Sequence, residues 1–439
     1  MRPHLFAAVM LLVVLLFSTA IIAQSPAQDA DATVGPTLYP EDVNPLTGLT
    51  VDDPAVLNRR PLIIKISNYP PLVRPQTGLN SADIVWEHLL AGGITRFSAV
   101  FYANNLPVVG PVRSARLIDF ELVRIYRGLS AYSGMSQGTI NILRTDALMS
   151  SRAIGDGGCP AYCRIPKEGL ALEHTLYGNT DALRDLAATW ERDTEPEFVY
   201  GMAFNPQPNA TSTPAESISV QYSETDITWR YDAASGNWLR FQDGEPHMDA
   251  LSDSQVAAAN VVVIEEEHTI QPFVSENYWG PENFAFSVNF IGDGRIYLFR
   301  DGEYTEGVWR RGDREDPLEY YDLNGDVLPF KPGNTFFILV PRWIDGYQLV
   351  FGLPDAPSAT VNGDEREGAS MRKGPGNAYI SPDVAYPGDR FAAIGRNKAG
   401  DWVQLQREGN PIIWLPVARL DLTKAQIAAL PIVRPTVER

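Results

Sequence analysis

The spacing of apolar residues predicts three buried strands early in the chain. Residues 62–66 form an apolar run interrupted by Lys65, and residues 83–90 and 94–102 are two further runs with many β-branched and aromatic side chains. Short runs of this kind, bounded by Pro, Gly and Asn, are typical of strands inside a sheet.

Two later segments change to a helical period. In residues 116–129 the apolar residues recur every three or four positions, which places them on one face of a helix. Ser114 precedes this segment and is expected to cap its first turn, and Gly128 lies near its end. A second helix is expected over residues 180–191.

The signal changes again in residues 218–352, which carry almost only strand patterns. Apolar and aromatic runs alternate there with turns that contain Gly or Asn, as in hairpins. Residues 205–217 and 353–368 are rich in Pro, Asp, Gly, Ser or Thr and have the composition of linkers or long loops.

Length and composition indicate how these elements are divided into domains. A chain of 439 residues is too long for one ordinary core, and 44% hydrophobic and 21% charged residues are globular values. We therefore predict an α+β protein with a mixed α/β N-terminal domain, a β-rich second domain and a small C-terminal β-barrel. The expected segments are a signal peptide 1–23, a linker 24–43, domains 44–204 and 218–352 separated by a linker 205–217, a linker 353–368, the barrel 369–422 and a tail 423–439.

The first residues predict export. Arg2 and His4 precede an apolar run over residues 5–23, interrupted by Ser18 and Thr19, and a polar segment follows, as in a secretory signal peptide cleaved after Ala23. The alternative is an uncleaved anchor, because the run is just long enough to span a bilayer. Either way, the body is expected outside the cytoplasmic membrane, extracellular or associated with the cell envelope.

Two cysteines, Cys159 and Cys163, are present. In an exported protein a pair this close is expected to form a small disulfide loop. A zinc site would need two more ligands, and His174 is the nearest candidate, so neither a metal nor a cofactor is expected.

One stretch of this acidic chain has an excess of basic residues. The chain carries a net charge of −18, which argues against a duplex nucleic-acid partner, yet residues 60–128 hold eight Lys or Arg against four Asp or Glu. Arginine presents a planar fork that suits anions. The predicted ligand-binding residues of this stretch are Arg74, Arg96, Arg113, Ser114 and Arg116.

The segment GPVRSAR at 110–116 makes the strongest case, because it leads into the expected helix. The amides of the first helical turn and the charges of Arg113 and Arg116 would together receive an anion. The alternative is structural, with Arg113 and Arg116 paired to Glu87 and Asp119 inside the fold.

A second set of candidates carries acid–base chemistry. His247 and Asp249 stand two residues apart, so on a strand both side chains share one face, where His247 would act as a base oriented by Asp249. Glu87 is the other candidate base. The alternative for His247 and Asp249 is a turn in which they bind backbone groups.

Several motifs resemble a known family. NPLTGL (44–49), RPQTGL (74–79), ADIVWE (82–87), GGITRF (92–97), GPVRSAR and GEPHMD (244–249) are similar, in order, to the YerB-like lipoprotein family, a group of exported bacterial proteins of uncharacterised function. Ala91 stands where that family usually has an acidic residue, and the lipid-bearing cysteine of the family is absent.

The C-terminal segment has a resemblance of its own. RKGPG (372–376), GDRF (388–391) and GDWVQLQ (400–406) resemble the bacterial Src-homology-3-like domain, which implies a small barrel that binds cell-wall peptides or protein partners.

Two functions follow from these observations. The first is an envelope protein that binds an anionic cell-wall polymer or peptide through the arginines. The second is an envelope hydrolase acting on a glycan or phosphodiester, with Glu87 or His247 as the general base. Because no complete set of nucleophile and base appears in the sequence, binding is the favoured hypothesis, and whether the protein is an enzyme stays open.

Overall fold

The computed structural model describes most of the chain after residue 31. The described ranges are residues 32–155, 157–196, 199–222, 224–276, 283–342, 348–352, 356–363, 368–381, 383–406 and 413–433. The predicted signal peptide, 1–23, lies outside them.

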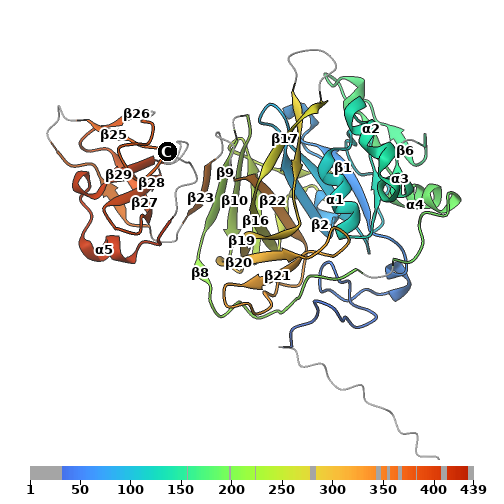
Figure 1. The fold of residues 1–439 in the computed structure, drawn as a ribbon, viewed down its shortest axis with the longest axis horizontal. Helices are drawn as coiled ribbons and strands as arrows, with labels where there is room; N and C mark the ends of the chain where they lie inside the picture. The colour runs from blue at the N-terminus through green and yellow to red at the C-terminus, as the bar shows by residue number, and fades with distance from the viewer. Residues whose placement is uncertain are drawn as a thin grey trace, which may run out of the picture.

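One mixed sheet of eleven strands organises the larger part of the molecule (Figure 1). From one edge to the other its strands are β21 (Glu319–Asp322), β20 (Glu303–Arg311), β19 (Gly292–Arg300), β16 (Asn260–Glu266), β22 (Thr335–Pro341), β2 (Ile84–Leu89), β3 (Thr95–Phe101), β1 (Leu62–Ser67), β4 (Leu129–Ala131) and β5 (Ala153–Ile154), with β8 (Thr213–Pro214) beside β20. Strand β22 lies in the middle and is buried along its whole length, in keeping with its unbroken apolar sequence TFFILVP.

The position of β22 joins the two predicted domains, 44–204 and 218–352. This strand comes from the second of them, yet it pairs in parallel with β2 from the first and with β16 from the second. The two segments therefore share one sheet rather than forming separate domains. The expected linker 205–217 contributes β8 to the same sheet.

Each face of this sheet carries its own layer. Alternate residues of a strand point to opposite faces, so Val85 packs into one core and Trp86 into the other. The Trp86 face is covered by α1 (Leu117–Ile125), α2 (Gln137–Thr145) and α3 (Ala147–Arg152).

A second sheet and helix α4 (Thr180–Thr189) cover the Val85 face. The strands of this second sheet are β12 (Glu245–Pro246), β11 (Asn237–Gln242), β10 (Asp226–Asp232), β9 (Ser217–Gln221) and β23 (Gln348–Gly352), with β15 (Ala257–Ala258) against β11. Trp229 and Trp238 lie between the sheets and contact Phe336 and Phe299 edge-on.

Smaller elements complete this part. A hairpin of β17 (His268–Ser275) and β18 (Phe284–Val288) packs against α1 and α2. Two further pairs are β6 (Tyr162–Arg164) with β7 (Leu176–Gly178) and β13 (Met248–Asp249) with β14 (Ser254–Gln255). Among the described residues of this part, the 3-10 helices are η1 (Pro54–Leu57), η2 (Pro71–Val73), η3 (Leu79–Ser81) and η4 (Leu172–His174), and η5 (Val417–Arg419) belongs to the C-terminal domain. Cys159 and Cys163 form a disulfide beside β6.

The local predictions near the N-terminus are confirmed in part. The three expected strands correspond to β1, β2 and β3, and the second expected helix to α4. Helix α1 is shorter than expected, and its N-cap is Arg116 rather than Ser114. The segment 24–43 was expected to be a tether, but Val34 and Phe204 exchange backbone hydrogen bonds of 2.8 and 2.7 Å, so the chain joins the folded body by residue 34.

A separate C-terminal domain lies beyond the second sheet (Figure 1). Its four-stranded sheet has the order β24 (Ser358–Thr360), β27 (Arg390–Arg396), β28 (Trp402–Gln406) and β29 (Ile413–Pro416), and β25 (Ala369–Met371) pairs with β26 (Asp383–Ala385). Two boundaries differ from prediction. Strand β24 lies inside the expected linker 353–368, and α5 (Lys424–Ala429) lies inside the expected tail, where Ile427 packs into the domain core.

Candidate functional site

Strand β2 separates two polar networks, because its neighbours Glu87 and His88 point to opposite faces of the sheet. Glu87 faces the second sheet and His88 faces helix α1. Both side chains are buried. The first network contains predicted site residues, the second lies beside the predicted arginines, and the two have different chemistry.

On the Glu87 side, a buried ion pair joins the two sheets. Arg240 on β11 donates through Nη2 to both carboxylate oxygens of Glu87, at 2.8 and 2.9 Å, and neither side chain is exposed. Thr95 donates a further hydrogen bond of 2.8 Å to the same carboxylate. Burial lowers the pKa of Arg240, and the charge of Glu87 opposes that shift.

His247 belongs to this network. Its Nδ1 accepts from Arg240 Nη1, and its Nε2 donates to Gln76 Oε1 at 2.6 Å. Burial and the charge of Arg240 keep its pKa well below the usual value, so the ring is neutral with both nitrogens engaged. The structure thus brings Glu87 and His247 together, but as parts of a saturated network, which leaves neither free to take a proton from a substrate.

Asp249 binds backbone groups in a turn, as the alternative interpretation of GEPHMD predicts. Its Oδ1 accepts from the backbone N–H groups of Leu251 and Ser252, and its Oδ2 accepts from that of Asn80 at 3.1 Å. These bonds stabilise the turn between β13 and β14 and tie it to the first part of the chain. Asp249 does not orient His247, whose partners are Arg240 and Gln76.

On the other face, Lys65 organises a network that the sequence analysis missed. Its Nζ donates to Asp119 Oδ1, Ser98 Oγ and His88 Nε2, each at 2.7 Å, so all three N–H groups are used. Burial lowers the pKa of Lys65 to about 8, and Asp119 opposes the shift. The one signal in the sequence is a lysine in the middle of a strand that is otherwise apolar.

Next to this network lie three of the four predicted arginines. Arg96 on β3 and Arg116 both donate to the carbonyl oxygen of Ser114, at 3.2 and 3.3 Å, and Arg113 donates to that of Glu173 at 2.7 Å. Burial lowers the pKa of Arg96, and the charges of Arg116 and Arg113 lower it further. We call Arg96, Arg113 and Arg116 the arginine cluster.

Arg74 is not part of the cluster. It forms an ion pair of 2.7 Å with Asp243 on the other side of the sheet. There it lines a hollow of about 290 Å³ with His247 and Met248. Three of the four predicted arginines therefore lie together, and Arg74 lies apart from them.

One detail of the expected anion receptor and the pairing considered as its alternative both differ from the structure. The N-terminus of α1 is already capped by a carboxylate, because Asp119 Oδ2 accepts from the backbone N–H of Arg116 at 2.7 Å. The side-chain pairing considered as the alternative is also absent from the described residues, since Glu87 pairs with Arg240 and Asp119 with Lys65. Ser114 takes part in the cluster through its backbone carbonyl oxygen, which accepts from Arg96 and Arg116.

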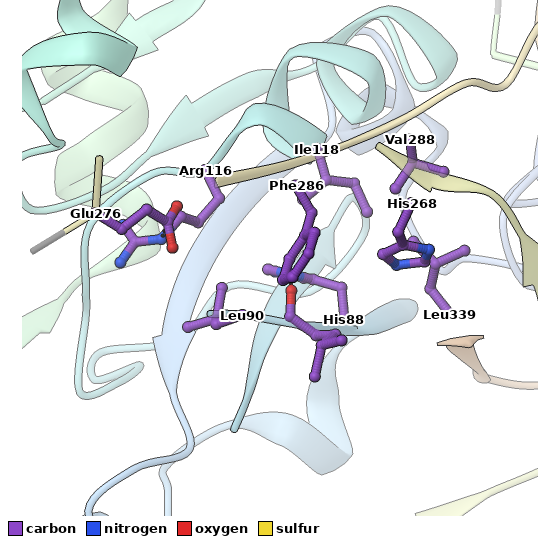
Figure 2. A pocket seen from close by; sticks show the side chains of 10 residues that line it. His88, Leu90, Arg116, Ile118, His268, Glu276, Phe286, Val288 and Leu339 are labelled. Carbon is purple, nitrogen blue, oxygen red and sulfur yellow. Dashed lines mark hydrogen bonds and ion pairs between the residues drawn. The ribbon is translucent and has the colours of Figure 1, made fainter. Parts of the chain in front are cut away.

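The hairpin β17–β18 reaches the cluster at Arg116, where Glu276 lies beside the guanidinium group (Figure 2). Glu276, at the end of β17, pairs with Arg116 through an Nε to Oε1 distance of 2.8 Å, and its side chain is 6% exposed. Beneath the hairpin a cavity of about 10 Å³ is lined by His88, His268 and Phe286 among others, which is room for about one water molecule. The site is therefore closed in this structure.

Comparison with known proteins places the chain in a family. Residues 46–193 match the family model described as "Protein of unknown function (DUF3048) N-terminal domain", and residues 218–337 match the corresponding C-terminal domain. The chain belongs to the DUF3048 family. The arginine cluster lies within the first matched segment and Arg240 within the second.

One relative, compared by sequence and by structure, extends this assignment. The Bacillus subtilis protein named "Putative lipoprotein YerB" is 28% identical over 307 residues, which cover 68% of this chain and 86% of the relative. A crystal structure of YerB from Bacillus subtilis is similar with a TM-score of 0.57 and 27% identity, covering 70% of this chain and 99% of that one. The name of the relative indicates association with the cell envelope. Among the described residues no helix is long and apolar enough to cross a membrane.

The DUF3048 models also bear on the fold. They divide the chain near residue 205, where the sequence analysis placed a linker, yet β22 carries the second segment back into the sheet of the first. The C-terminal domain that begins at β24 lies outside both matched segments. In the part of the chain that is described, no group of three or more His, Cys, Asp or Glu side chains could hold a metal ion.

Proposed function

We propose that this DUF3048 protein is an envelope protein that binds an anionic cell-wall polymer or peptide, with the arginine cluster as the binding site. The name of the Bacillus subtilis relative supports the location. The positions of Arg96, Arg113 and Arg116 support the chemistry, since guanidinium groups bind carboxylate and phosphate through paired hydrogen bonds.

An excess of positive charge is the observation that carries this proposal. Arg96 and Arg116 donate to one carbonyl oxygen, Glu276 is the carboxylate paired with Arg116, and the charge of Glu173 acts on Arg113. The neighbouring Asp119 is already bound by Lys65. Burial lowers the pKa of His174 beside the cluster to about 4, and the charges of Arg113 and Arg96 contribute to the shift. An additional anion would reduce this repulsion.

Glu276 acts in this proposal as an internal counter-ion. Its carboxylate lies 2.8 Å from Arg116, which supports the proposal that an oxyanion of that size fits there. A ligand anion would take the place of the Glu276 carboxylate and move the end of β17 outward. Arg113, which is only partly buried, would meet the ligand first.

The C-terminal domain has a supporting role in the proposal. Its short strands and its sequence likeness to the bacterial Src-homology-3-like domain favour a binding module that holds the protein to the wall or to a protein partner. This role is separate from the arginine cluster, because the domain has its own core.

The test is a titration of the folded protein with two probes, poly(glycerol phosphate) and poly-glutamate. Arg113→Ala removes a charge-assisted contact worth about 1.5–3 kcal/mol, so the affinity should fall by roughly one to two orders of magnitude. Arg74→Ala, which removes the same charge outside the cluster, serves as the matched control.

Comparing the probes identifies the ligand class, phosphate polymer or acidic peptide. Equal weakening by Arg113→Ala and Arg74→Ala would mean that only overall charge matters, and would exclude the cluster as the site. Failure of both probes to bind the unsubstituted protein would exclude the proposed function.

A further inference from the structure

A second hollow lies at the other end of the central strands. It has a volume of about 680 Å³ and opens where β2, β16 and β22 begin, beside Asp83, Ala259 and Asn334. The arginine cluster lies near the opposite ends of β2 and β22. Six residues of strand at about 3.3 Å each separate the two sites by roughly 20 Å, so they are independent.

The floor of this groove is fixed by internal hydrogen bonds. Asn44 donates to Asp83 at 2.7 Å, and Asn80 accepts from the backbone N–H of Ala257 at 2.9 Å. Asn334 donates to the carbonyl oxygen of Ala257 at 2.8 Å. The floor therefore has a defined shape before any ligand arrives, which reduces the entropic cost of binding.

The walls keep unused polar groups. Within the described ranges, the side chains of Thr50, Asp52 and Asn237 form no hydrogen bond, although all three line the groove. Thr50 and Asp52 come from the first part of the chain and Asn237 from β11, so a ligand would contact both DUF3048 segments. A hollow of this size lies within the range of about 300–1,000 Å³ that small-ligand sites occupy.

The negative charge of the groove excludes the anionic ligands that we propose for the arginine cluster. Asp52 and Asp53 line it, and the ammonium group of Lys331 is already bound by Asp301 at 2.9 Å and by the carbonyl oxygen of Gly236 at 2.7 Å. An anionic polymer would be repelled. Hydroxyl and amide groups remain, and an amide presents a donor and an acceptor side by side, which matches paired hydroxyl groups.

We infer that this groove binds a neutral, hydroxyl-rich chain, namely a segment of uncharged oligosaccharide. Thr50 and Asn237, which come from different parts of the chain, hydrogen-bond its hydroxyl groups, and Asp52 accepts from a third. The inference is independent of the proposed function, because it uses other residues and another class of ligand.

The experiment is a calorimetric titration of the full chain with a neutral hexamer of N-acetylglucosamine, a neutral hexamer of glucose, and hexalysine. Asn237→Ala and Thr50→Val should each weaken binding of the sugar that binds the unsubstituted protein more tightly. The expected weakening is about two- to tenfold, the effect of one hydrogen bond. Ala103→Phe fills the groove without removing a polar group and should weaken binding at least as much. Asn362→Ala, in the C-terminal domain, is the matched control and should change nothing.

Each outcome is decisive. Sugar binding that is weakened by the three groove variants, but not by Asn362→Ala, supports the inference. The inference is overturned if neither sugar binds at millimolar concentration, if the groove variants bind like the control, or if hexalysine binds more tightly than both sugars. A melting curve of each variant ensures that a loss of binding is not a loss of folding.

Discussion

At the scale of single residues, the fold gives side chains that are neighbours in the sequence entirely different partners. Glu87 and His88 are adjacent in sequence, yet one neutralises Arg240 and the other accepts a hydrogen bond from Lys65. Arginine content in the sequence located the basic region. It could not show which guanidinium groups have partners, because those partners come from distant parts of the chain.

Asp83 should give the protein an unusual pH dependence. Burial raises its pKa to about 6, and hydrogen bonds from Tyr102 N–H and Asn44 oppose the shift. In the pH window between 3.8, the ordinary pKa of an aspartate, and about 6, the folded state holds a proton that the unfolded state has released. The stability from this group is therefore complete below the lower limit and is lost as pH rises through the upper one.

The variant Asp83→Asn removes this titration. Relative to the variant, the unsubstituted protein should lose about 2–3 kcal/mol of unfolding free energy as pH rises through that window. Urea unfolding of both proteins across the window measures the difference. Parallel stability curves for the two proteins would show that Asp83 does not titrate there.

Arg113 and Lys65 offer a contrast in stability. Arg113→Ala should change the unfolding free energy by less than about 1 kcal/mol, because the side chain is partly exposed and its hydrogen bond is to the Glu173 carbonyl oxygen. Lys65→Met should cost about 3–5 kcal/mol, because it deprives the buried Asp119 carboxylate of its cation. Thermal melts of both variants test this, and a large drop for Arg113→Ala would mean that Arg113 is structural.

At the scale of elements, the Glu87–Arg240 pair links β2 of the large sheet to β11 of the second sheet. Glu87→Gln and Arg240→Met should each cost about 3–5 kcal/mol, because each leaves one buried charge without its partner. The double variant should cost clearly less than the sum of the two. Denaturant unfolding of the four proteins gives the coupling energy, and simple additivity would refute a direct interaction.

Local patterns predicted the elements better than their pairing. Strands β1 to β3 and helix α4 follow from the spacing of their own apolar residues. The place of β22 between β2 and β16 could not be predicted, because parallel pairing depends on contacts between residues more than two hundred positions apart. The contact between Glu276 and Arg116 could not be predicted either, because it exists only where the β17–β18 hairpin packs over α1.

At the scale of the whole molecule, the chain consists of a two-sheet body and a C-terminal domain with its own core. Ending the chain after Gly352 should leave the melt of the body cooperative and its midpoint nearly unchanged. Ending it in residues 205–217 should prevent folding, because that truncation removes β22 from the middle of the sheet. Calorimetry of both truncated proteins tests this, and a folded shorter form would show that the two DUF3048 segments are separable.

The central claim is that the arginine cluster is an anion site held by Glu276 until a ligand arrives. Its most direct test is the affinity of poly(glycerol phosphate) or poly-glutamate for Glu276→Gln, with Asp243→Asn as a control that removes the same charge beside Arg74. If Glu276 competes with the ligand, Glu276→Gln should bind about tenfold more tightly than the unsubstituted protein, and Asp243→Asn should bind as the unsubstituted protein does. Unchanged or weaker binding by Glu276→Gln would contradict the account.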